Sequence, residues 1–209
     1  MAKKINKQID NSTEEKIKEA ARKLFTKKGF AAVKTRDIAE EAGINLALLN
    51  YYFRSKEKLF DIIMAEAMQQ FIQGVALIFN DEKTSVDQKL EGVVENYIDM
   101  LTHYPDLPFF VLNEIRTHPE KMAAKMEAII QPARSTFFKQ IHEMMIAKKK
   151  EPIHTLHLMA NMMGLIVFPF IGAPLLKKIN NVNDKQFIEL MRERKKLIPI
   201  WIKGMIMAM

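Results

Sequence analysis

Residues 35–53, TRDIAEEAGINLALLNYYF, carry the pattern that most constrains how this chain can fold. Apolar positions three and four residues apart predict two short helices with a tight turn between them. Thr35 is predicted to cap the first helix, Gly43 to end it in a left-handed conformation, and Asn45 to cap the second. Two helices joined by a short turn that contains glycine are typical of the helix-turn-helix, which lays its second helix in the DNA major groove.

The second helix of this pair is predicted to present a small outward face. The helical spacing places Leu46, Leu49, Tyr52 and Phe53 inward, and Ala47, Leu48, Asn50 and Tyr51 outward. Ala47 and Leu48 offer only apolar contact with thymine methyls, so an A·T-rich site is expected, with Asn50 as the polar reader. Helix starts and cations favour phosphates. The candidate DNA-binding residues are Thr35, Arg36, Asn45, Leu46, Ala47, Leu48, Asn50, Tyr51 and Lys56.

Residues 13–60 resemble the DNA-binding region of the TetR family of bacterial transcription regulators. The resemblance rests on four motifs in order: KLF and KKGF at the end of a first helix, TRDIA and EAG in the second, YF in the third, and SKE with a later leucine opening the fourth. The third helix departs from the family, because many members carry a small polar run and a further tyrosine where this chain has Leu46, Ala47, Leu48 and Asn50. That departure concerns which bases are read.

The charge of the chain is concentrated near its start. Residues 1–60 hold 14 Lys or Arg against 8 Asp or Glu, whereas residues 61–209 hold 18 against 17. A basic excess on the candidate reading unit is what attraction to phosphates requires. With no cysteine, disulfides and thiolate metal sites are excluded. The first residues are polar and basic and do not read as a secretory signal, so a cytoplasmic location is expected.

The rest of the chain is predicted to be helical, which makes the fold all-α. Ser12 and Glu15 predict a capping box at the start of the first helix, which ends at Gly29. A fourth helix is expected from Ser55 to about Phe79. Further helices are expected near 85–103, 107–117, 119–149 with a bend or break at Pro132, 153–171 and 184–206. The predicted domains are a three-helix DNA-binding domain at 1–54 and a larger ligand-binding and dimerisation domain at 55–209.

The apolar run at residues 158–176, LMANMMGLIVFPFIGAPLL, is nearly long enough to span a membrane. Asn161, two glycines and two prolines interrupt it, so we favour a helix buried in a core and against a partner subunit. A second apolar stripe lies near the C-terminus. The TetR resemblance implies that these last two long helices pair with their copies in a homodimer.

Methionine is frequent, and 14 of the 15 lie after residue 60. Flexible thioethers and aromatic rings suit a pocket for a small ligand, although ordinary core packing is the simpler explanation for any one residue. The resemblance implies an effector site in this helical domain. The candidate ligand-binding residues are Met100, Tyr104, Phe109, Phe110, Met122, Met126, Phe137, Met159 and Met163.

No catalytic motif is present, so an enzyme is disfavoured and no cofactor is expected. His154 and His157 are three residues apart but have no nearby acidic ligand, which argues against a metal site. The favoured function is a sequence-specific transcription regulator, a repressor released from its operator by a small molecule. A helical ligand-binding or carrier protein without DNA function is the alternative class, and an activator or architectural DNA binder is the other regulatory alternative.

Overall fold

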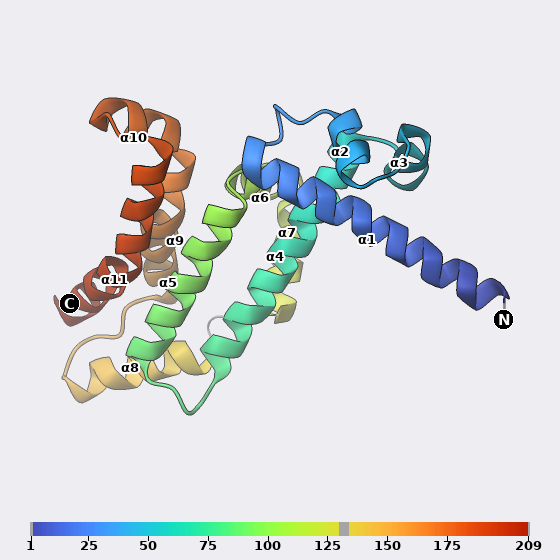
Figure 1. Cartoon of the computed structure of the whole chain (residues 1–209). Helices are drawn as coiled ribbons and strands as arrows, with labels where there is room; N and C mark the ends of the chain where they lie inside the picture. Colours follow the sequence, from blue (N-terminus) through green and yellow to red (C-terminus); the bar gives the residue numbers. More distant parts are fainter. Residues whose placement is uncertain (1, 130–133, 209) are drawn as a thin grey trace. The chain divides into compact units, whose positions relative to one another are not determined.

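In the computed structural model, residues 2–129 and 134–208 are described, and within them the chain forms eleven α-helices and no strand (Figure 1). The first four are α1 (Ala2–Lys28), α2 (Thr35–Glu41), α3 (Leu46–Phe53) and α4 (Lys56–Asn80). The others are α5 (Val86–His103), α6 (Leu107–Thr117), α7 (Pro119–Ile129), α8 (Thr136–Ala147), α9 (Thr155–Ile171), α10 (Ala173–Asn180) and α11 (Asp184–Ala208). The all-α fold predicted from the sequence is confirmed.

The chain forms two compact units, and the boundary between them falls inside α4. The first unit holds the residues up to Met68 together with the short loop Tyr104–Asp106. The second unit holds Gln69–His103 and the chain from Leu107 onward. The boundary predicted at residue 54 divides the chain by function, between the reading helices and the rest, and stays a prediction.

The core of the first unit joins one face of each of its four helices. Helices α1 and α2 bury apolar side chains at helical spacing, and α3 and the first half of α4 close over them. The buried residues include Ile17, Ala21, Leu24, Phe25, Val33, Ile38, Ala39, Leu49, Phe53, Leu59, Ile63 and Met64. Phe25, Phe30 and Phe60 form an aromatic cluster, with ring centroids 4.5–5.7 Å apart. This core sets the position of α3 within the unit.

Helix α1 begins at Ala2, so the predicted start at a Ser12 capping box is wrong. The preceding residues contain neither glycine nor proline and include alanine, lysine and glutamine, which are good helix formers. A serine within such a run is tolerated, and the helix continues through it. The predicted end is confirmed, because α1 stops at Lys28 and Gly29 has a φ of 75°.

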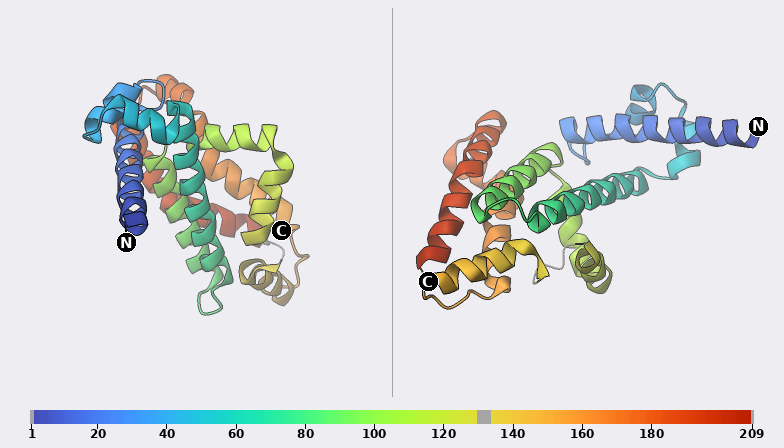
Figure 2. Two further views of the ribbon diagram at one scale, coloured as in Figure 1. Left: turned by 90° about the vertical axis from the view of Figure 1, so that its right-hand side faces the viewer. Right: turned by 90° about the horizontal axis from the view of Figure 1, so that it is seen from below.

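In the second unit α5, α9 and α11 pack against one another, as the views in Figure 2 show. Helix α5 buries a stripe that includes Leu90, Val94, Ile98 and Leu101. Two ion pairs on the rim join α11 to α5: Lys195 Nζ lies 2.6 Å from an Asp99 carboxylate oxygen, and Lys203 pairs with Asp87. Exposed pairs of this kind contribute little, so the apolar stripe dominates the packing.

The helix positions predicted for the second unit are confirmed for α5, α6, α9 and α11 within one or two residues. The stretch predicted at 119–149 contains α7 and α8, and the expected break at Pro132 lies outside the described residues. Helix α10 was not predicted. It follows α9 across a 69° bend at Gly172, and none of its residues is buried.

Within the described residues, α4 is the only individual helix that is long and apolar enough to cross a membrane. Helices α9 and α10 reach that length and hydropathy only when they are taken together as a bent pair. The apolar side chains of α4 are used for packing in both units. Those buried are Leu59, Ile63, Met64, Ala67, Ile72, Val75 and Phe79. Core packing therefore accounts for these seven apolar side chains, whereas Ile62 and Leu77 of the same helix are exposed.

Candidate nucleic-acid interface

The start of α2 is held by a local backbone motif. Thr35 is its first residue, and Lys34 occupies the N-cap position, so the prediction that Thr35 caps this helix is wrong. The Lys34 N–H donates to the Asp37 carboxylate at 3.0 Å, and the Asp37 N–H donates back to the Lys34 carbonyl at 3.0 Å. An aspartate in the first turn also suits the positive end of the helix dipole.

The turn between α2 and α3 has the predicted chemistry. Gly43 has a φ of 66°, a conformation that glycine adopts without steric cost. The Ile44 N–H donates to the Ala39 carbonyl at 3.0 Å, which closes the end of α2. Asn45 then caps α3, its side-chain oxygen accepting the Leu48 N–H at 2.8 Å. Both the glycine and the cap predictions are confirmed.

Helix α3 presents one face to the core and one to solvent. Leu49 and Phe53 are buried, whereas Ala47, Asn50 and Tyr51 are exposed. Tyr51 is 77% exposed and meets Tyr52 edge to ring, with centroids 5.4 Å apart. The candidates Leu46 and Leu48 are half-buried, and Asn45 is exposed. An exposed α3 face with a small residue, an amide and a phenol offers apolar and hydrogen-bonding groups of the kind that read base edges in a major groove.

Exposed cations lie at the starts of α2 and α4, the helices that precede and follow α3 in the chain. Arg36 is exposed in the first turn of α2, beside the half-buried Thr35. Lys34, Arg54 and Lys58 are exposed as well, next to the starts of α2 and α4, and none was among the candidates. In the sequence, only the general basic excess of residues 1–60 pointed to these three cations. Cations near helix starts suit phosphate contacts, which position a protein on a duplex.

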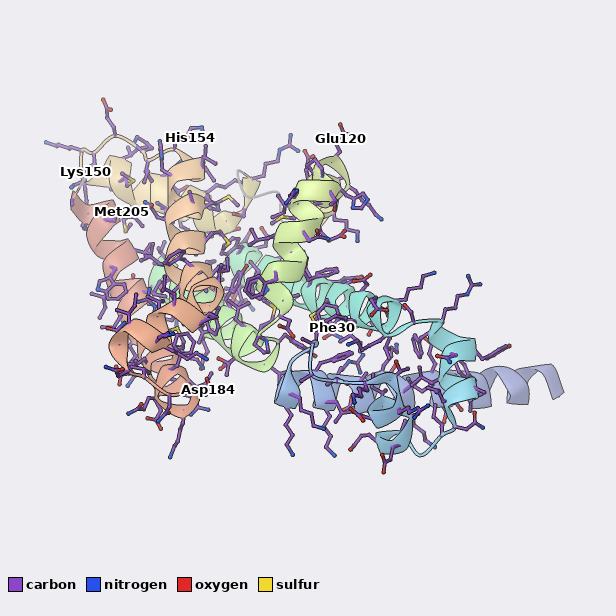
Figure 3. The ribbon with its side chains drawn as sticks, turned by 90° about the horizontal axis from the view of Figure 1, so that it is seen from above. Phe30, Glu120, Lys150, His154, Asp184 and Met205 are labelled. Atoms are coloured by element: carbon purple, nitrogen blue, oxygen red, sulfur yellow. The ribbon has the colours of Figure 1, made fainter. Side chains whose placement is uncertain are left out.

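The candidate Lys56 forms hydrogen bonds to the loop after α1. Its ammonium donates to the carbonyls of Phe30 and Val33 at 3.1 and 2.9 Å, and it lies 4.1 Å from the centre of the Phe30 ring. Figure 3 marks Phe30 in this loop. Two of the three ammonium protons are thus used inside the unit. A phosphate contact by Lys56 stays a prediction.

The loop Tyr104–Asp106 also fixes this segment. The Phe30 N–H donates to the Asp106 carboxylate at 2.8 Å, across 76 residues of sequence. Gly29, just before it, adopts a φ of 75°. Lys56 and Asp106 together hold both backbone polar groups of Phe30. We expect this bracing to determine where α2 starts relative to α1.

An ion-pair network ties α1 to α4 within the first unit. Glu66 binds Lys18 at 2.9 Å and Arg22 at 2.7 Å, and Glu15 binds the same two cations at 2.8 Å each. The hydrogen bond from Lys18, and then that from Arg22, lowers the pKa of the Glu15 carboxyl. The network reinforces the apolar contact between the two helices.

The candidate ligand residues occupy different environments. Phe137 is fully buried and stacks on Phe79 with ring centroids 4.6 Å apart, and Met122 is buried. Phe109 and Met163 are exposed, and the half-buried candidates are Met100, Tyr104, Phe110, Met126 and Met159. Tyr104 belongs to the first unit. A ligand pocket lined by these residues stays a prediction.

Met163 has one specific contact. It accepts a hydrogen bond from the Tyr97 hydroxyl at 3.7 Å, and Phe71 meets the Tyr97 ring edge-on with centroids 4.2 Å apart. Burial raises the pKa of Tyr97 to about 12, so this hydroxyl is a donor throughout the physiological range. The Tyr97 residue as a whole is half-buried, between Phe71 and Met163.

The histidines have structural contacts. His154 caps α9, its Nδ1 accepting the Leu156 N–H at 3.2 Å, and its ring lies 6.2 Å from that of His157. Figure 3 shows His154, Lys150 and Met205 at one end of the second unit. Across residues 2–129 and 134–208, no three metal-ligating side chains of His, Asp or Glu come together.

Known proteins share this arrangement. The family described as "Bacterial regulatory proteins, tetR family" matches residues 17–62. The probable HTH-type transcriptional regulator YttP of Bacillus subtilis is 24% identical over 199 residues, covering 92% of this chain and 93% of YttP. The HTH-type transcriptional repressor NicS of Pseudomonas putida is 29% identical over 110 residues, covering 53% and 51% of the two chains.

Solved structures share the fold. The TetR family regulator PfmR from Thermus thermophilus superposes with a TM-score of 0.56 at 17% identity, covering 87% of this chain and 96% of PfmR. FadR from Bacillus subtilis, solved in complex with stearoyl-CoA, gives a TM-score of 0.50 at 19% identity, covering 88% and 96%.

The capped helix-turn-helix, its exposed α3 face and the exposed cations at the starts of α2 and α4 define a DNA-binding transcription regulator. The family match falls on the same helices, and a relative named as a regulator of this type extends along nearly the whole chain. The chain is therefore similar to regulators of the TetR family, and the family match itself spans residues 17–62.

Proposed function

We propose that this regulator is a homodimeric, cytoplasmic repressor that a small molecule releases from its operator. The observation that supports release is the continuity of α4. Its residues up to Met68 pack in the first unit and those from Gln69 pack in the second, within one unbroken helix of 25 residues. A ligand that displaces helices of the second unit would therefore act on the reading unit through α4.

The proposed roles follow the predicted division of the chain. Residues 1–54 read the operator, and residues 55–209 bind the effector and form the dimer. A dimer must place its reading helices in successive major grooves, about 34–36 Å apart. A tilt of α4 that changes this spacing by a few ångströms would lower affinity. By linkage, the effector must bind the DNA complex less tightly than the free protein, by the same factor.

Operator binding is tested by selecting bound duplexes from a random pool and then titrating the selected site at several salt concentrations. A regulator should bind with a steep dependence of log affinity on log salt, since binding releases counterions. A carrier protein without DNA function should recover no consensus and show no such slope. The same titration with an effector added separates a ligand-released regulator, whose affinity falls, from a DNA binder whose affinity the ligand leaves unchanged.

The effector is sought by thermal shift. The interior is rich in methionine and aromatic rings, and the structural neighbour FadR was solved with stearoyl-CoA, so a long-chain acyl-CoA is a suitable first probe. We expect the variants Met126→Trp and Met163→Trp to reduce the response of operator binding to any effector found, while affinity without effector is retained. A parental response in both variants would place the pocket elsewhere.

A further inference from the structure

Helix α11 carries a row of four residues that are only partly covered by their own chain. Leu190, Arg194, Leu197 and Trp201 follow one another at intervals of four, three and four residues, the spacing of a coiled-coil seam. The two leucines are 43% and 38% exposed, and Trp201, the single tryptophan of the chain, is 41% exposed. We call these four residues the α11 seam. In Figure 3 it lies on the helix between the labelled Asp184 and Met205.

Arg194 is the one charged residue of the seam, and it is half-buried. Its guanidinium donates from Nη2 to the Leu165 carbonyl of α9 at 2.7 Å and lies 5.1 Å from the centre of the Trp201 ring. The buried Nε has no hydrogen-bond partner in the described part of the chain, and no carboxylate there forms an ion pair with Arg194. Burial lowers the pKa of this guanidinium.

A half-buried cation without a counter-charge is costly, and the cost is lowered when a carboxylate approaches. The nearest acidic residue along the helix is Glu193. It is exposed, and it too forms no ion pair within residues 2–129 and 134–208. Because it precedes Arg194 directly, its side chain projects from a different side of α11 and cannot serve as a seam partner of Arg194 in the same helix.

We propose that the α11 seam packs against the α11 seam of a second copy, and that Glu193 of each copy pairs with Arg194 of the other. This inference rests on the proposed homodimer and specifies what selects its partner. In a two-fold interface each contact occurs twice, with residue i meeting j and j meeting i. Two α11 helices that cross at this level bring each Glu193 beside the opposing Arg194.

The pair sets register and partner choice. Leucine contacts tolerate sliding and foreign partners, whereas a single polar residue in a seam fixes one alignment at some cost in stability. A seam from another regulator without an acid at the position of Glu193 would leave Arg194 uncompensated on binding. The chain would thereby discriminate against mixed dimers.

The test uses two charge reversals, Arg194→Glu and Glu193→Arg, with Lys185→Glu on the exposed surface of the same helix as the control. Dimer dissociation constants are measured by analytical ultracentrifugation. Each reversal alone sets like charges against each other, and we expect the dissociation constant to rise at least about 30-fold. The control should match the parent. A 1:1 mixture of the two reversed variants should form dimers of near-parental affinity, because opposite charges then meet in the mixed pair.

Rescue in the mixture is the decisive result, since a role of Arg194 within its own chain cannot be restored by another chain. Weakened homodimers without rescue would refute the pairing while leaving the dimer in place. Parental affinity in both variants would place Arg194 and Glu193 outside the interface. A parent chain that is monomeric at micromolar concentration would instead refute the homodimer itself.

Discussion

The hydrogen bond from the Phe30 N–H to the Asp106 carboxylate should govern local opening of the loop after α1. The bond is 2.8 Å long, partly buried, and accepted by a charged group. Such bonds contribute about 1.5–3 kcal/mol, and we use the lower end because water can replace part of the loss. Asp106→Ala should therefore make opening easier by about 1.5 kcal/mol, and the Phe30 amide should exchange its hydrogen roughly ten times faster.

Hydrogen exchange followed by NMR measures this rate directly. Asp106→Asn retains an oxygen acceptor and should show a smaller increase than Asp106→Ala. Asp81→Ala is the matched control, because Asp81 accepts the Lys83 N–H at 2.9 Å in another loop and has no contact with Phe30. Exchange at Phe30 that is unchanged in Asp106→Ala would refute the bracing role of the Tyr104–Asp106 loop.

Four further outcomes are expected. Asn45→Ala should lower the free energy of unfolding by about 1 kcal/mol, because α3 loses its cap; urea denaturation measures this. Arg36→Ala should weaken all duplexes similarly and reduce the salt slope by about one, and an unchanged slope would remove it from the interface. Selected duplexes should be rich in A·T pairs, since Ala47 and Leu48 offer only apolar contacts; a guanine-rich consensus would contradict this. The pKa of the Glu15 carboxyl is lower in the folded protein than in the unfolded chain, where it is near 4.5. The stabilisation by ionised Glu15 should therefore be complete above pH 4.5 and be lost as the pH falls through the lower pKa of the folded state. Glu15→Gln should flatten that part of the curve of unfolding free energy against pH.

The features predicted correctly from the sequence are those that depend on near neighbours. The cap by Asn45 and the left-handed Gly43 involve contacts within three or four residues, where the identity of a residue largely determines the backbone conformation. The long helices followed from apolar periodicity in the same way. Thr35 failed as a cap because the adjacent Lys34–Asp37 motif took that position, a one-residue shift that periodicity does not resolve.

Contacts between distant residues carry no such local signal. Asp106 reaches Phe30 across 76 positions, and Lys56 reaches it across 26, so neither brace could be found from spacing. The candidate ligand residues show the same limit. Phe137 is buried and Phe109 is exposed, although both are aromatic residues in amphipathic helices. Which residues line a cavity depends on how helices pack, and that is decided by the whole unit.

The membership of Tyr104–Asp106 in the first unit means that the DNA reader is assembled from two separate pieces of the chain. Consider a hybrid made by joining the first unit of this chain to the second unit of another regulator at a single point inside α4. A single junction within α4 would separate Phe30 from Asp106. The first unit would then meet the corresponding loop of a different chain. A working hybrid would need three junctions: one in α4 and one on each side of Tyr104–Asp106, so that these three loop residues come from the same chain as the first unit.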